Sequence, residues 1–123
     1  MTTRKLVTLF ASALLIQVPA FAHEAAPRHG GVVSTASDLQ FELVQKGADA
    51  VIFVDNHGKP FPTAGMTGNL VLLKGAEKTE FALEPAGDNQ LTAKGAKAGS
   101  GARAVAVINR AKAKPISVRF VVK

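Results

Sequence analysis

Short apolar stretches separated by turn-forming residues run along most of this chain of 123 residues. In residues 39–44, the apolar residues Leu39, Phe41 and Leu43 occupy every second position, which is the period of a strand with one buried face. Residues 50–54 read Ala-Val-Ile-Phe-Val, and a continuous apolar run of this length is typical of a strand buried on both faces. We therefore predict a strand in each segment.

Further stretches of the same kind recur with Gly, Pro, Asn or Asp between them, and none after residue 22 has a helical period. The other predicted strands are residues 32–34, 69–73, 79–83, 90–93, 102–108 and 116–122. This spacing predicts an all-β domain over residues 32–123. We expect a single antiparallel β-sandwich (immunoglobulin-like) or a small barrel of about seven to eight short strands.

One predicted turn contains side chains that could take part in metal binding. Residues 55–59 read Asp-Asn-His-Gly-Lys, in which Asn and Gly accept a positive φ and Asp can bond to the local backbone. Pro60 and Pro62 follow, and we expect them to prevent regular strand pairing around Phe61.

The first 22 residues are typical of a secretory signal peptide. Arg4 and Lys5 precede an apolar stretch over residues 6–18, and Ala20 and Ala22 flank one residue in the small-x-small pattern that signal peptidase cuts. The stretch is about 13 residues long, shorter than the ~20 that span a bilayer, so we favour cleavage over a retained membrane anchor.

Cleavage after Ala22 would leave His23 as the first residue and export the chain, with a bacterial periplasm as the natural destination. We expect residues 23–31 to form a flexible, histidine-containing segment, and we expect no membrane span after cleavage.

Composition excludes several kinds of chemistry. The chain has no Cys, which excludes a thiol nucleophile, a disulfide, a cysteine zinc site and an iron–sulfur cluster. It also has no Gly-x-Ser-x-Gly motif and no glycine-rich phosphate loop, so we do not expect an enzyme.

Charge is unevenly distributed along the chain. All nine acidic residues lie between Glu24 and Asp88, whereas Asn89 and the residues after it include eight basic residues and no acidic one. The basic half is either a solvated surface or a face that binds polyanions. Nucleic acid is not an expected partner, because the chain has no Tyr or Trp on which bases could stack.

The three histidines carry the candidate chemistry. A mature N-terminal His23 offers its amine and its imidazole to one metal ion, a chelate suited to copper(II), and Glu24 could complete such a site. This chelate depends on cleavage after Ala22. His29 is either a second nitrogen ligand or a residue of the flexible segment.

The second candidate is Asp55 with His57, because a turn can direct a carboxylate and an imidazole toward the same metal. Asp55 could instead cap the turn, and His57 could simply be exposed. Met66 is either a thioether ligand for copper(I) or a packing residue.

Several motifs together resemble a known family. They are His29-Gly30-Gly31-Val32-Val33, residues 39–44, Asp55-Asn56-His57-Gly58-Lys59-Pro60 and residues 83–91. This pattern resembles the small β-rich domain of periplasmic adaptor subunits of cobalt–zinc–cadmium type heavy-metal efflux systems, and of their stand-alone exported relatives. The resemblance extends from His29 to about residue 120.

What the resemblance implies is a metal-handling role in the periplasm. His29 and His57 fall on family-like positions, whereas Met66 stands where a small residue is expected. A looser resemblance, in residue type only, links His23, Asp55 and His57 to exported copper-binding β-sandwich proteins.

The sequence thus leads to two hypotheses. The first is a periplasmic protein that binds copper(II) or zinc as a buffer or chaperone in heavy-metal efflux or resistance. Its ligands would come from His23, Glu24, His29, Asp55 and His57. The alternative is a metal-free envelope interaction module that docks to an efflux component.

Overall fold

The computed structural model describes residues 26–123, which form nine β-strands and include no helix able to cross a membrane. The strands are β1 (Val32–Ala36), β2 (Leu39–Lys46), β3 (Asp49–Asn56), β4 (Lys59–Pro60), β5 (Thr67–Lys74), β6 (Glu77–Ala86), β7 (Gln90–Ala93), β8 (Arg103–Arg110) and β9 (Ala113–Val121). The predicted all-β antiparallel fold is confirmed. Each of the predicted strands is present, and the two-residue β4 is additional.

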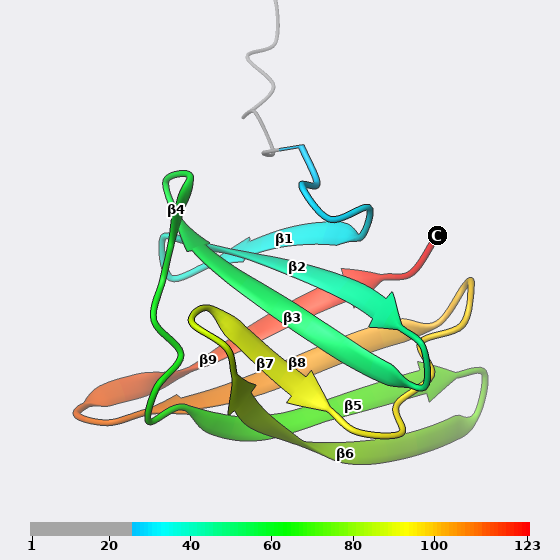
Figure 1. The fold of residues 1–123 in the computed structure, drawn as a ribbon. Helices are drawn as coiled ribbons and strands as arrows, with labels where there is room; N and C mark the ends of the chain where they lie inside the picture. Colours follow the sequence, from blue (N-terminus) through cyan, green and yellow to red (C-terminus); the bar gives the residue numbers. More distant parts are fainter. Residues whose placement is uncertain (1–25) are drawn as a thin grey trace, which may run out of the picture.

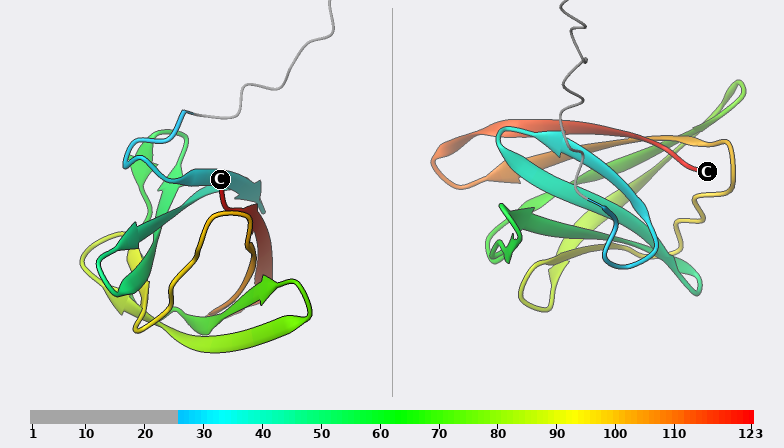
Figure 2. Two further views of the ribbon diagram at one scale, coloured as in Figure 1. Left: turned by 90° about the vertical axis from the view of Figure 1, so that its right-hand side faces the viewer. Right: turned by 90° about the horizontal axis from the view of Figure 1, so that it is seen from above.

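The strands form one antiparallel sheet in the order β1-β2-β3-β7-β6-β5-β8-β9, and β4 pairs with β3 (Figure 1). The sheet curls until its two end strands, β1 and β9, lie beside each other, although they form no ladder with each other. Figure 2 shows the strands surrounding a common interior. Of the two predicted architectures, the fold is closer to the small barrel, with an open seam between β1 and β9.

The interior is filled by apolar side chains from the alternating inward positions. Its largest fully buried apolar side chains are Phe41, Ile52, Leu70, Leu83, Leu91, Ile108, Ile116, Val54 and Val118. Ala104 and Ala106 of β8 are also fully buried, and small residues of this kind leave room for larger ones in a narrow barrel. The prediction that residues 50–54 are buried on both faces is confirmed.

The turn after β3 is shorter than predicted. Asp55 and Asn56 belong to β3 and Lys59 to β4, so only His57 and Gly58 form the turn. Their φ angles are 48° and 84°, as a two-residue hairpin turn requires. Here a histidine occupies a left-handed position that asparagine or glycine more often fills.

The expectation about Pro60 and Pro62 holds in part, because β4 ends at Pro60 and Phe61 lies outside any strand, yet Pro60 itself pairs with β3. It lies opposite Asp55, while the next residue, Phe61, donates its N–H to the carbonyl of Val54 at 2.9 Å. Because hydrogen-bonded and non-hydrogen-bonded positions alternate in an antiparallel pair, Pro60 occupies a position where β3 needs no donor. The proline is therefore compatible with this short edge strand.

Candidate functional site

The outer face of β2 and β3 carries four side chains that are buried although they point away from the barrel interior, namely those of Glu42, Val51, Phe53 and Asp55. Glu42 and Phe53 are cross-strand partners, and they are only 5% and 4% exposed. Both lie on the opposite side of the sheet from the inward-facing Phe41 and Ile52. Their burial requires a covering segment outside the sheet, and the residues just before β1 provide it.

The Glu42 carboxylate holds this segment by three backbone hydrogen bonds. Its Oε1 accepts the N–H of Arg28 at 2.8 Å, and its Oε2 accepts the N–H groups of His29 at 2.8 Å and Gly31 at 2.9 Å. Hydrogen bonds to an ionised acceptor are stronger than neutral ones and offset the cost of burying the charge. Residues 28–31 were expected to be flexible, but three of them are tied to β2.

The close approach of this segment to β2 requires glycine at position 31. A Cβ at Gly31 would lie 2.2 Å from the carbonyl oxygen of Leu43 and 2.8 Å from Cγ2 of Val44. Both separations are below any van der Waals contact. The Gly30-Gly31 pair of the sequence therefore has a packing role at its second position.

The ring of Phe53 is covered by two side chains. The His29 imidazole stacks on it with a centroid separation of 3.7 Å and an interplanar angle of 11°. The Lys46 ammonium nitrogen lies 5.0 Å from the same ring centroid, within the range of a cation–π contact. Stacking on Phe53 fixes the orientation of the His29 ring. Because the lone pairs of imidazole nitrogens lie in the ring plane, the stacking does not cover these nitrogen atoms.

Arg28 connects the covering segment to the β3–β4 turn. Its guanidinium donates to the carbonyl of Gly58 at 2.9 Å. His57, the preceding residue of that turn, is exposed. The predicted ligand His57 is therefore next to the turn residue that the N-terminal segment contacts.

Asp55 lies at the end of β3 and is 9% exposed. Its Oδ1 accepts a long hydrogen bond, 3.4 Å, from the side-chain amide of Asn89. A cavity of about 10 Å³ is lined by Asp55, Glu42, Arg28 and Ala26 among others, a volume close to the least that holds one water molecule. The first described residue, Ala26, thus lines the same small cavity as Asp55.

The predicted ligands do not form one compact cluster in the described part of the chain. His23, Glu24 and the predicted signal peptide lie outside the described residues. Within residues 26–123, His29, Asp55 and His57 do not come together as a group of three that could hold a metal ion. Met66 is 5% exposed within the hydrophobic core, in agreement with a packing role.

Glu42 and Phe53 were not singled out from the sequence. Their outward positions follow from the alternation in β2 and β3, but their burial depends on a segment more than ten residues earlier in the chain. The Gly-Gly pair before β1 was the available signal, because adjacent glycines permit a close backbone approach.

Comparison of the chain with protein-family models, with curated proteins and with solved structures gave no match. The resemblance to efflux adaptor domains therefore stays a prediction from the motifs.

Proposed function

We propose that this protein is an exported transition-metal binder that holds copper(II) or zinc and buffers the ion or passes it to a heavy-metal efflux component. In this proposal His23 supplies its amine and imidazole, and His57 supplies a second imidazole. Asp55 or Glu24 completes the coordination. The observation that carries the proposal is the attachment of residues 28–31 to Glu42, with Arg28 reaching the His57–Gly58 turn.

Chain length supports a shared site for the N-terminus and the turn. Ala26 lines the same small cavity as Asp55, and His23 is three positions before it along the chain. An extended chain covers ~3.3–3.6 Å per residue, so this separation gives a reach of about 10 Å. His23 thus has a short tether to the end of the sheet that carries Asp55 and His57.

The donor set suits the proposed ions. Copper(II) and zinc both accept imidazole and carboxylate ligands, and copper(II) also favours an amine–imidazole chelate. The His29 ring nitrogens remain available as an alternative donor, since its stacking on Phe53 occupies only the ring face. The resemblance to efflux adaptor domains supports the same proposal of a metal-binding protein.

The proposal is tested with the chain exported under its own signal and purified from the periplasm. Native mass spectrometry first checks that the chain begins at His23, and copper(II) and zinc are then titrated by calorimetry. We expect one tightly held ion, loss of tight binding in His23→Ala, and weaker binding in His57→Ala. Lys59→Ala, an exposed residue of the same hairpin, is the matched control and should bind as the wild type does.

Two results would contradict this function. One is a correctly cleaved chain that takes up neither ion. The other is tight binding that survives both histidine substitutions. Because protonated imidazole and amine groups cannot bind a metal, affinity should also fall on acidification from about pH 7.5 to about pH 5.5.

A further inference from the structure

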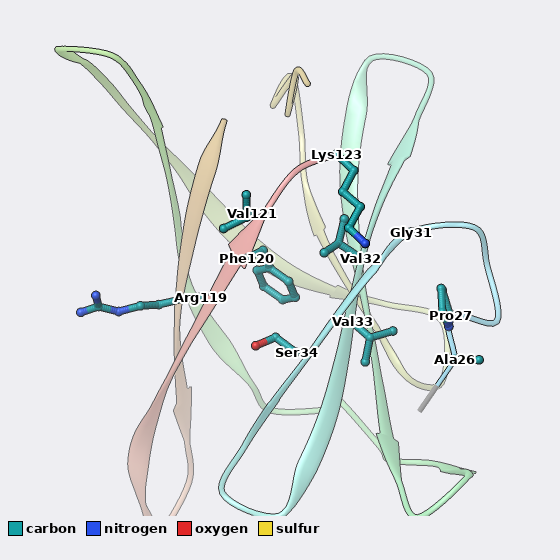
Figure 3. A pocket seen from close by; sticks show the side chains of 10 residues that line it. All are labelled: Ala26, Pro27, Gly31, Val32, Val33, Ser34, Arg119, Phe120, Val121 and Lys123. Carbon is teal, nitrogen blue, oxygen red and sulfur yellow. The ribbon is translucent and has the colours of Figure 1, made fainter. Parts of the chain in front are cut away.

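The outer face of β6, β5, β8 and β9 is a feature that metal binding does not explain. These strands are neighbours in the sheet, and residues at their inward positions, such as Leu70, Ala104 and Val118, are buried in the core. Because successive side chains of a strand alternate between the two faces, the residues between them point outward. In Figure 3, Arg119 extends to the side of β9 opposite the inward-facing Phe120. We call this outward surface the four-strand face.

Strand pairing places an acidic and a basic residue at opposite ends of one row across the four-strand face. The register of three strand pairs gives this row as Glu80, Val71, Val105 and Arg119. The two charged residues are exposed, and the two valines are half-buried. Neighbouring strands lie about 4.8 Å apart, so the backbones of Glu80 and Arg119 are about 14 Å apart and the valines separate their side chains. The two charges are thus free to pair with another molecule.

The row is complementary to itself. A two-fold axis parallel to the strands, between β5 and β8, would present the row of a second copy in reverse order. Glu80 of each copy then faces Arg119 of the other, and Val71 faces Val105. Packed sheets lie about 10 Å apart, a distance that a Glu and an Arg side chain span together. One row therefore supplies two ion pairs around an apolar centre, and a two-fold interface requires such self-complementarity.

The rows on either side are compatible with the same arrangement. One row reads Lys78, Leu73, Arg103 and Val121, and the other reads Ala82, Asn69, Val107 and Ser117. Under the same rotation Lys78 faces Val121 and Arg103 faces Leu73, so no two basic side chains lie directly opposite each other. The other row has no charged residue. An axis across the strands would instead place β9 over β9, which has no acidic residue to pair with Arg119. The charges therefore favour the axis parallel to the strands.

We propose that the four-strand face joins two copies of this chain in a weak two-fold dimer, with reciprocal Glu80–Arg119 ion pairs around Val71 and Val105. Three rows of four strands cover about 20 Å by 20 Å, roughly half of the ~800 Å² per partner of a standard interface. We therefore expect a Kd of about 100 μM. The interface shares no residue with the proposed metal ligands, so the two proposals stand or fall separately.

Sedimentation velocity of the exported chain, with a metal chelator present, tests the proposal. We expect mainly monomer at about 10 μM and mainly dimer at about 1 mM, as the proposed Kd requires. Association should weaken when salt is raised from about 0.05 M to about 0.5 M, because exposed ion pairs are screened. The chelator excludes a dimer that forms only through a shared metal ion.

Two charge reversals locate the interface. Glu80→Arg and Arg119→Glu each make both ion pairs of the dimer repulsive, so each variant alone should associate about tenfold more weakly. An equimolar mixture of the two variants restores both attractive pairs and should associate as the wild type does. Lys59→Glu makes the same change of charge as Arg119→Glu at an exposed position outside the face, and it should leave association unchanged.

Three results would overturn the proposal. The first is a wild-type chain that stays monomeric at about 1 mM. The second is a dimer that both single variants form as readily as the wild type, and the third is a mixture that associates no better than its two components. A monomer that binds phosphatidylglycerol vesicles, and loses this binding in Arg119→Glu, would identify an anionic lipid surface as the occupant instead.

Discussion

The outer face of β2–β3 is buried, whereas the outer face of β8–β9 is exposed. On β2–β3, Glu42 and Phe53 are nearly inaccessible because residues 28–31 lie over them. On β8–β9, Val107 is 37% exposed and Val121 is 63% exposed. The difference arises both from β3, which is apolar at every position from 50 to 54, and from the segment that covers Glu42 and Phe53.

The charged groups of the two faces explain why residues 28–31 lie over β2–β3. The Glu42 carboxylate receives three backbone N–H groups, which replace the water that burial removes. Arg119 and Arg103 on the other face are exposed and need no such partners. One buried acid therefore directs the N-terminal segment toward the β3–β4 turn and leaves the outer face of β8–β9 uncovered.

The largest expected effect is on the covered face. Phe53→Ala should lower the free energy of unfolding by about 3 kcal/mol, because it removes a buried ring and the surface on which His29 stacks. Val107→Ala, an outward-facing apolar position on β8, is the control and should cost under about 1 kcal/mol. Urea unfolding measures both. Equal losses would remove the distinction between the two faces.

A smaller loss is expected from Glu42→Gln, about 2 kcal/mol in the same assay. The amide nitrogen of glutamine cannot accept a hydrogen bond, so at least one N–H of residues 28–31 loses its partner. Glu80→Gln, an exposed change on β6, should be nearly neutral. An unchanged stability in Glu42→Gln would mean that the three hydrogen bonds do not hold the segment.

His29 should contribute about 1 kcal/mol through its stacking on Phe53. His29→Ala should lose this amount, and His29→Phe should restore most of it because the ring contact is kept without the nitrogen atoms. These two variants also distinguish a packing role of His29 from a role as metal ligand. If His29→Phe binds metal as the wild type does, His29 is not a ligand, whereas failure to rescue stability would contradict the stacking role.

The smallest effect is expected on the exposed face of β9. Val121→Thr should change the free energy of unfolding by no more than about 0.5 kcal/mol, since its side chain is mostly exposed. A loss above about 1 kcal/mol would show that another part of the molecule covers this side chain.

Much of the fold could be predicted from local pattern. Alternation over residues 39–44 and the apolar run over residues 50–54 reveal β2 and β3, because side-chain direction in a strand repeats every two residues. The role of Pro60 could not be predicted in this way. Whether a proline interrupts pairing depends on which of its sides faces the neighbour, and this is set by the register of the hairpin.

The candidate site was only partly predictable for a related reason. Residue type is enough to identify His29, Asp55 and His57 as candidate metal ligands. It does not show that His29 stacks on Phe53 while His57 lies in the turn. The burial of Glu42 is set by residues 28–31, and such contacts between distant segments leave no periodic signal in the chain.

Amide hydrogen exchange, measured residue by residue in the wild type and in Glu42→Gln, tests the central claim most directly. The amides of Arg28, His29 and Gly31 should exchange slowly in the wild type and faster in the variant, because each donates to Glu42. Fast exchange at residues 28, 29 and 31 in the wild type would contradict the account, because the segment would then not be held beside the turn.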